Sequence, residues 1–228
     1  MSAKKYDVYA IGNAIVDYEI EVDNAFLEAN GVEKGLMTLA EQDRQDDLLR
    51  AAKSNIRKKQ AGGSAANSVV ALAQLGGTGF YSCKVALDVD GTFYRDDLVE
   101  QGVATNLSDA KLDEGVTGKC LVMITPDAER TMSTFLGISS NLSLSELNLD
   151  QLENSHYLFL EGYLVSSPSG FEAIKEAKKR AKTAGVKTAL TFSDPSMVKY
   201  FGDQMHEVVG EGVDLLFCNE EEALLYAG

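Results

Sequence analysis

The residues best suited to bind a polar ligand begin with a pair of glycines in the first third of the sequence. Gly62 and Gly63 precede apolar residues at helical spacing, and because glycine has no Cβ, a ligand can approach the backbone where this helix begins. Asn67 lies one helical turn further on and offers a side-chain amide at the same place. A glycine turn that merely precedes a buried helix explains the same residues equally well.

A carboxylate provides the second candidate for ligand binding. Asp17 lies just past the end of the first predicted strand, where ligands bind in open α/β sheets. Its two oxygens can accept hydrogen bonds from two vicinal hydroxyls, such as those of a ribose. The alternative is an ordinary polar residue on the solvated face of a strand.

A third candidate lies near the end of the sequence, where Asn219 and Glu222 follow a predicted strand and open a helix. The N-x-x-E spacing brings both side chains to one side of the first helical turn. A helix N-cap followed by acids that suit the helix dipole is a second explanation.

The elements that must position these residues alternate between strands and helices, which is typical of a parallel sheet covered on both faces. Strands are predicted at residues 6–11, 79–85, 157–160, 187–192 and 213–217. Helices are predicted after Gly63 and at residues 41–54, 90–101, 169–184, 204–209 and 219–227. This pattern predicts an α/β fold with a central, mostly parallel sheet.

A second group of strands alternates apolar and polar residues, which indicates one wet face. These strands lie at residues 14–22, 37–39, 117–124 and 130–136, with a turn at 125–129. We therefore predict a core of residues 1–12, 40–113 and 137–228, with its C-terminal part absent, and a small separate sheet of residues 13–39 and 114–136. Residues 57–59, Arg-Lys-Lys, are interpreted as a solvated patch.

The composition excludes several classes of function. A net charge of −14 disfavours nucleic acid and anionic membranes as partners. No apolar run approaches the length of a membrane span, and the N-terminus does not resemble a signal peptide. The three cysteines are far apart, which indicates neither a disulfide framework nor a zinc site. A cytoplasmic protein is expected.

The segment A-G-G-S-x-x-N-S at residues 61–68 resembles the N-terminal signature of the ribokinase-like (PfkB) carbohydrate and nucleoside kinases, and most closely the adenosine kinase branch. The resemblance extends from Gly12 to Glu222. The family's second signature, D-T-x-G-A-G-D, carries the catalytic aspartate and the anion hole and is absent from this sequence. We therefore expect the N-terminal part of a kinase, inactive by itself.

The resemblance implies a ribokinase-like fold with a β-sheet lid, and phosphoryl transfer from ATP, with Mg²⁺, to a primary hydroxyl of a nucleoside or sugar. By this resemblance the sugar is bound by Asn13, Asp17, Gly62, Gly63 and Asn67, and the base or sugar pocket is lined by Leu136 and Tyr163. Arg130 is the catalytic residue that contacts the transferred phosphoryl group. Asn219 and Glu222 bind ATP, and Glu222 also binds the metal. Alternatives are a fructose or ribose kinase, or a binding protein without turnover. A monomer or a homodimer is expected.

Overall fold

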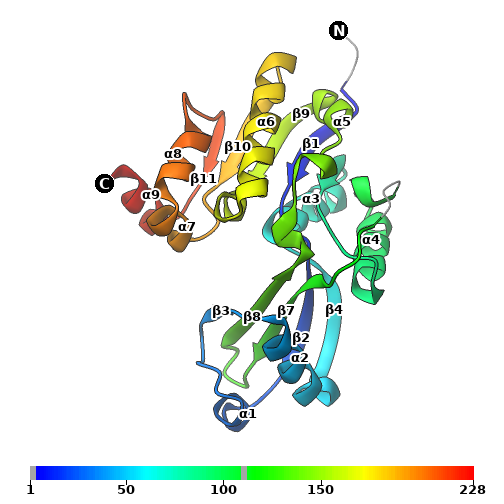
Figure 1. Cartoon of the computed structure of the whole chain (residues 1–228), viewed down its shortest axis with the longest axis vertical. Coiled ribbons are helices and arrows are strands. Elements are labelled where there is room, and N and C mark those ends of the chain that lie inside the picture. The colour runs from blue at the N-terminus through cyan, green and yellow to red at the C-terminus, as the bar shows by residue number, and fades with distance from the viewer. Residues whose placement is uncertain (1–3, 109–111) are drawn as a thin grey trace.

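The computed structural model describes residues 4–108 and 112–228, which form two β-sheets with helices around each of them (Figure 1). The larger sheet has six parallel strands in the order β11-β10-β9-β1-β5-β6. These strands are β1 (Tyr6–Ile11), β5 (Gly79–Ser82), β6 (Ala104–Thr105), β9 (Ser155–Glu161), β10 (Lys187–Thr191) and β11 (Leu215–Phe217). The predicted strand–helix alternation therefore builds one parallel sheet.

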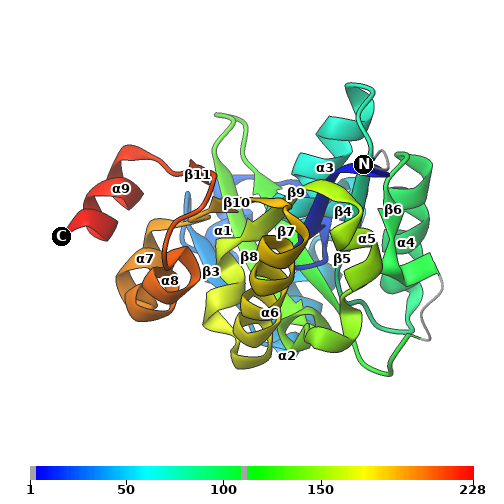
Figure 2. The same ribbon diagram turned by 90° about the horizontal axis from the view of Figure 1, so that it is seen from above.

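Helices cover both faces of the larger sheet because successive side chains of β1 point to opposite sides. Ala10 packs with Ala65 of α3 (Ser64–Gln74), whereas Tyr9 and Ile11 pack with Ala173 of α6 (Pro168–Ala184). Figure 2 shows α3 and α6 on opposite sides of the sheet. The remaining helices around this sheet are α4 (Val89–Glu100), α5 (Leu149–Glu153), α7 (Pro195–Tyr200), α8 (Gly202–Val209) and α9 (Glu220–Ala227).

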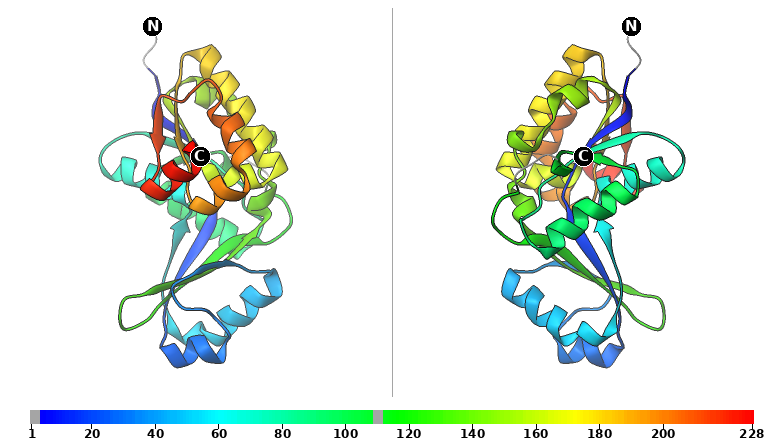
Figure 3. Two further views of the ribbon diagram at one scale, coloured as in Figure 1. Left: turned by 90° about the vertical axis from the view of Figure 1, so that its left-hand side faces the viewer. Right: turned by 90° about the vertical axis from the view of Figure 1, so that its right-hand side faces the viewer.

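The smaller sheet has the strand order β3-β8-β7-β2-β4. Its strands are β2 (Ile15–Glu21), β3 (Met37–Leu39), β4 (Ile56–Gly62), β7 (Thr117–Ile124) and β8 (Arg130–Gly137). Strand β7 forms the predicted hairpin with β8 and lies parallel to β2. One face of this sheet contributes Ile20 and Leu121 to a core with Leu27 of α1 (Asn24–Ala29) and Leu48 of α2 (Gln42–Ala51). Figure 3 shows both helices at the end of the molecule formed by this sheet.

The structure changes one boundary of the predicted division. Strand β4 lies within residues 40–113, which were assigned to the core, yet it pairs antiparallel with β2 and forms an edge of the smaller sheet. Residues 57–59 are part of this strand. Their charges concealed it because long charged side chains are common on edge strands but do not alternate with apolar residues. Residues 1–3 and 109–111 of the predicted core lie outside the described part of the chain.

Short 3-10 helices join several of these elements, at Lys53–Asn55, Asn106–Ser108, Ile138–Asn141, Leu144–Glu146 and Gly162–Ser166. Among the helices of residues 4–108 and 112–228, none is both long enough and apolar enough to cross a membrane.

Candidate functional site

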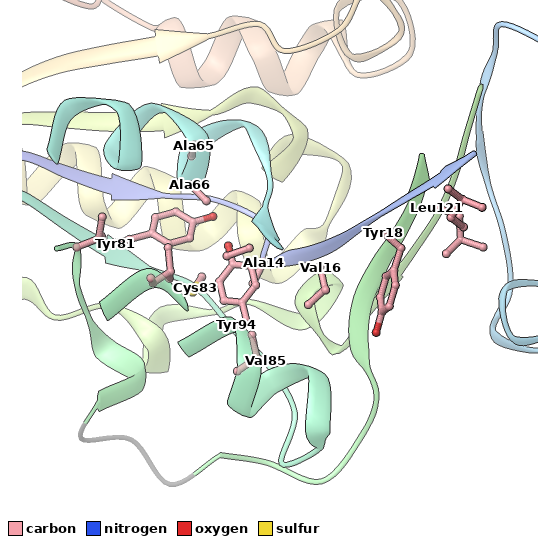
Figure 4. Close-up of a cluster of buried hydrophobic side chains, with 14 of the residues drawn as sticks. Ala14, Val16, Tyr18, Ala65, Ala66, Tyr81, Cys83, Val85, Tyr94 and Leu121 are labelled. Carbon is pink, nitrogen blue, oxygen red and sulfur yellow. The ribbon is translucent and has the colours of Figure 1, made fainter. Parts of the chain in front are cut away.

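The junction between the two sheets lies where β2 begins, β4 ends and β7 begins. Strand β2 lies between β4 and β7, with Ile15 opposite Gly62 on one side and opposite Gly118 on the other. The end of β1 leads through residues 12–14 directly into β2, and Figure 4 shows Ala14, Val16 and Tyr18 following one another from this junction. The junction therefore lies at the carboxyl edge of the parallel sheet, where ligands bind in such folds.

Asp17 and Gly62 are in direct contact at this junction. A Cβ added to Gly62 would lie 2.6 Å from Asp17 Oδ1 and closer still to Oδ2, so the carboxylate fits only because the glycine has no side chain. Burial raises the pKa of Asp17 to about 6, and the positive charge of Arg130 opposes this rise. The predicted aspartate and the predicted glycine therefore form one unit.

Asn13 and Gly63 form a second contact beside the first. Gly63 has a φ of 104°, which favours glycine, and a Cβ there would collide with the carbonyl oxygen of Asn13. The same carbonyl accepts a hydrogen bond from the Tyr81 hydroxyl at 2.9 Å, and Asn13 Oδ1 accepts one from Ser139 Oγ at 3.0 Å. The start of α3 is thereby held against the junction between β1 and β2.

A hollow of about 480 Å³ opens next to Asn13. Leu136, near the end of β8, and Tyr163 both line it, as do Ser140 and Ser167. Burial raises the pKa of Tyr163 to about 12, so its hydroxyl is neutral at physiological pH. The hollow therefore combines an aromatic ring and an aliphatic side chain with several hydroxyl groups.

Two predicted residues lie at the margin of this arrangement. Asn67 is exposed on α3, one turn after Gly63, whose carbonyl accepts a hydrogen bond from the Asn67 backbone amide at 2.9 Å. Arg130 is exposed at the start of β8, opposite Ile124. Burial raises the pKa of both Asp17 and Cys120, and the positive charge of Arg130 opposes the rise at each of them.

Asn219 and Glu222 form a capping box at the start of α9. Asn219 Oδ1 accepts a hydrogen bond from the Glu222 amide at 2.8 Å, and Glu222 Oε2 accepts one from the Asn219 amide at 3.0 Å. Both Glu222 oxygens are engaged by Asn219, and the side chain is buried. Within residues 4–108 and 112–228, no group of three or more potential ligands could hold a metal ion. The assignment of Mg²⁺ to Glu222, with water as its other ligands, stays a prediction.

Glu161, which the sequence analysis did not single out, connects the junction between β1 and β2 to the start of α3. It ends β9 with 1% of its surface exposed, and its carboxylate accepts hydrogen bonds from the Asn13 amide and from Ser64 Oγ, both at 2.5 Å. Burial raises its pKa to about 7, although both hydrogen bonds oppose the rise. The rule that selected Asp17, an acid at the carboxyl end of a strand, also applies to Glu161.

A different hollow, of about 450 Å³, lies over β9, β10 and β11. Its lining is mostly apolar and includes Phe159, Leu215 and Phe217. It contains none of the predicted site residues, so the junction at the end of β1 is the better candidate for chemistry.

Comparison with known proteins decides the family. A model of the pfkB family of carbohydrate kinases matches residues 38–228, which is most of the chain. The chain belongs to this family. The predicted membership is therefore confirmed.

Curated relatives of this pfkB-family chain include nucleoside kinases. It is 25% identical to a guanosine-inosine kinase from Escherichia coli K12, over 97% of this chain and 52% of the relative. It is 24% identical to an adenosine kinase from Schizophyllum commune, over 97% of this chain and 64% of the relative. The chain thus spans about half to two thirds of the length of these proteins.

Solved structures of an adenosine kinase and of a probable sugar kinase share the fold. An adenosine kinase from Sinorhizobium meliloti is 37% identical, with a TM-score of 0.85, over 98% of this chain and 68% of that one. A probable sugar kinase from Rhizobium etli is 30% identical, with a TM-score of 0.88, over 98% and 67%. The predicted ribokinase-like α/β fold is therefore confirmed.

Proposed function

We propose that this chain carries the acceptor-binding part of an ATP-dependent kinase that phosphorylates a primary hydroxyl of a nucleoside, with an adenosine-like nucleoside favoured. The observation that carries the proposal is the contact between Asp17 and Gly62 at the carboxyl edge of β1, together with the hollow beside Asn13 that Leu136 and Tyr163 line. The carboxylate suits two vicinal hydroxyls of a ribose. The aromatic and aliphatic side chains suit the flat face of a base.

The remaining predicted residues take roles around this acceptor. Asn13, Gly63 and Asn67 complete the sugar side, while Arg130 stabilises negative charge on the phosphoryl group during transfer. Asn219 and Glu222 face the nucleotide. In support of the role of Arg130, its positive charge opposes the burial-driven rise in the pKa of Asp17.

We further propose that the protein works in the cytoplasm as a monomer or homodimer, and that neither nucleic acid nor a membrane is its partner. Its net charge of −14 supports this proposal, because an acidic surface repels both nucleic acid and anionic lipid. We therefore propose small molecules, namely a nucleoside and ATP, as its ligands.

A sugar acceptor, fructose or ribose, is the second candidate. The serine hydroxyls at positions 140 and 167 favour it, because a hollow rich in hydroxyl groups can bind a sugar without a base. A binding protein without turnover would use the same residues.

Thermal shift measurements with adenosine, guanosine, ribose and fructose at matched concentrations test the proposal. We expect adenosine to stabilise the protein most, because its base adds contacts with Leu136 and Tyr163 to those of its ribose. A ligand at ~100 times its Kd adds about 2.7 kcal/mol to the free energy of unfolding. Asp17→Asn should reduce the shift, because an amide keeps the shape of the carboxylate but loses its charge. Glu19→Gln, which changes an acid two residues further along β2, should retain it. A larger shift with ribose or fructose would favour the sugar kinase, and no shift with any compound would refute the proposed function.

A further inference from the structure

Helix α4 lies beside the junction between the two sheets (Figure 1). Its N-cap residue, Asp88, accepts hydrogen bonds from the backbone amide of Thr117 at 2.9 Å and from the Thr117 hydroxyl at 2.6 Å. Thr117 is the first residue of β7, where the chain enters the smaller sheet. A Cβ on Gly91 would lie 2.9 Å from Thr117 Oγ1, so the first turn of α4 packs closely against this segment.

Asp90, in the first turn of α4, binds one side chain from each of three adjacent strands of the smaller sheet, β7, β2 and β4. Its Oδ1 accepts a hydrogen bond from the Tyr18 hydroxyl of β2 at 2.6 Å and pairs with Lys59 Nζ of β4 at 2.6 Å, while Oδ2 pairs with Lys119 Nζ of β7 at 3.2 Å. The side chain of Asp90 is 11% exposed. Lys59 also lies over the ring of Phe93 and is therefore not part of a solvated patch.

The second and third turns of α4 bind the segment that carries the glycine pair. The Tyr94 hydroxyl donates a hydrogen bond to the carbonyl of Gly62 at 2.8 Å, and Asp97 accepts one from the backbone amide of Ala61 at 2.6 Å. Tyr94 is fully buried, and Figure 4 shows its ring next to Ala14. Helix α4 thus contacts Gly62 itself and the residue before it.

These contacts lie on the opposite side of β2 from the carboxylate of Asp17. Successive side chains of a strand point to opposite faces, so Tyr18 reaches α4 while Asp17 faces Gly62 and the candidate site. We propose that α4 sets the position of Asp17 and Gly62 for ligand binding, with Asp90 and Tyr94 as positioning residues. This inference rests on the proposed function of Asp17 as a ligand-binding group.

The physical basis is that buried polar groups with several partners have one favoured arrangement. Burial alone would raise the pKa of Asp90, yet hydrogen bonds from Lys59 and Tyr18 hold it below its usual value, so the group stays charged. A buried charge that loses a partner is costly, and the smaller sheet cannot tilt away from α4 without breaking such contacts.

The test compares Tyr94→Phe with Tyr9→Phe. Both changes remove one hydroxyl from a fully buried ring, but the Tyr9 hydroxyl bonds Ser82 and Asn148, not Gly62. We expect Tyr94→Phe to weaken adenosine binding by about 5- to 30-fold in titration calorimetry, and Tyr9→Phe by less than about twofold. Equal losses in both variants would overturn the proposal.

A double-mutant cycle separates positioning from general damage to the fold. If α4 acts through Asp17, Tyr94→Phe should have a smaller effect on binding in the Asp17→Asn background, whereas Tyr9→Phe should have the same effect in both backgrounds. Additive losses for Tyr94→Phe would contradict the proposal. Should Tyr94→Phe fail to fold by circular dichroism, Asp90→Asn replaces it, with Asp96→Asn on the same helix as the control, because Asp96 is largely exposed and pairs with Arg95.

Hydrogen exchange measured without ligand tests the role of α4 separately from the proposed function. If the wild type binds none of the nucleosides, the function fails, and hydrogen exchange then decides the role of α4. Amides of residues 15–20 and 117–122 should exchange at least about tenfold faster in Tyr94→Phe than in Tyr9→Phe. Equal exchange in the two variants would show that α4 does not position the smaller sheet.

Discussion

The substitution Gly62→Ala tests whether the contact with Asp17 matters for binding rather than for folding. The new Cβ would lie 2.6 Å from Asp17 Oδ1 and closer to Oδ2, whereas ordinary van der Waals contact begins at 3.4 Å. The carboxylate must therefore move by about 1 Å, a misplacement that can cost about 10²-fold where a group orients a substrate. Gly62 has no positive φ, so alanine introduces no backbone strain.

The expected stability change is small because two effects oppose each other. Replacing glycine by alanine at a compatible position stabilises by about 0.4–1 kcal/mol through the unfolded state. Moving the Asp17 side chain off its preferred rotamer costs about 0.5–1.5 kcal/mol. We therefore expect urea unfolding within about 1 kcal/mol of wild type, together with a 10- to 100-fold loss of adenosine affinity, at about 1.4 kcal/mol for each tenfold.

Titration calorimetry with adenosine and with ribose measures the loss, and Gly202→Ala is the matched control. Gly202 has open space around its Cβ position and no positive φ, so its substitution should leave binding unchanged. In the Asp17→Asn background, Gly62→Ala should cost less than in wild type, since the group it displaces already binds weakly. Wild-type affinity in Gly62→Ala, with a loss in Asp17→Asn, would refute the steric reasoning.

Two further predictions concern pH. Because the pKa of Asp17 is raised to about 6, adenosine affinity should rise between about pH 5 and pH 7 as the carboxylate ionises, and then level off. Calorimetry should find no such rise in Asp17→Asn. Equal affinity of the wild type at both pH values would contradict the assignment of Asp17. The pKa of Glu161 is raised from 4.5 to about 7 in the folded protein, which therefore holds this proton more tightly than the unfolded chain does. The free energy of unfolding should fall by up to about 3 kcal/mol as pH rises from about 4.5 to about 7. Urea titrations should show a weaker fall in Glu161→Gln, and identical pH profiles of the two proteins would contradict this role of Glu161.

The sequence predicts most of the fold because the periodicities of its main elements are strong. The helix after Gly63, the strand at Tyr6–Ile11 and the hairpin of β7 and β8 all lie where their patterns place them. Strand β4 could not be predicted in this way, since Ile56–Gly62 has no alternation of its own and is defined by its pairing with β2. Its membership of the smaller sheet is a property of long-range contacts.

The candidate site was predictable where a residue type has a local reason for its position. Asp17 and Gly62 follow from strand ends and from glycine chemistry, and the structure brings them together. The roles of Asp90 and Tyr94 depend on partners from distant strands, so no spacing within α4 indicates them. For Asn219 and Glu222 the local explanation, a capping box, is the one that the structure displays.

The hydrogen bond between Asn13 and Glu161 has a consequence for how the protein is made. It joins residues 148 positions apart, and at ~5–20 residues per second β9 leaves the ribosome about 7–30 s after the start of β2. Until then one edge of β1 has no neighbour, and the side of β1 that carries Tyr9 stays uncovered until α6, which follows β9, is also made. Translation speed and chaperone supply during these seconds should therefore affect the yield of folded protein more than they affect its final stability.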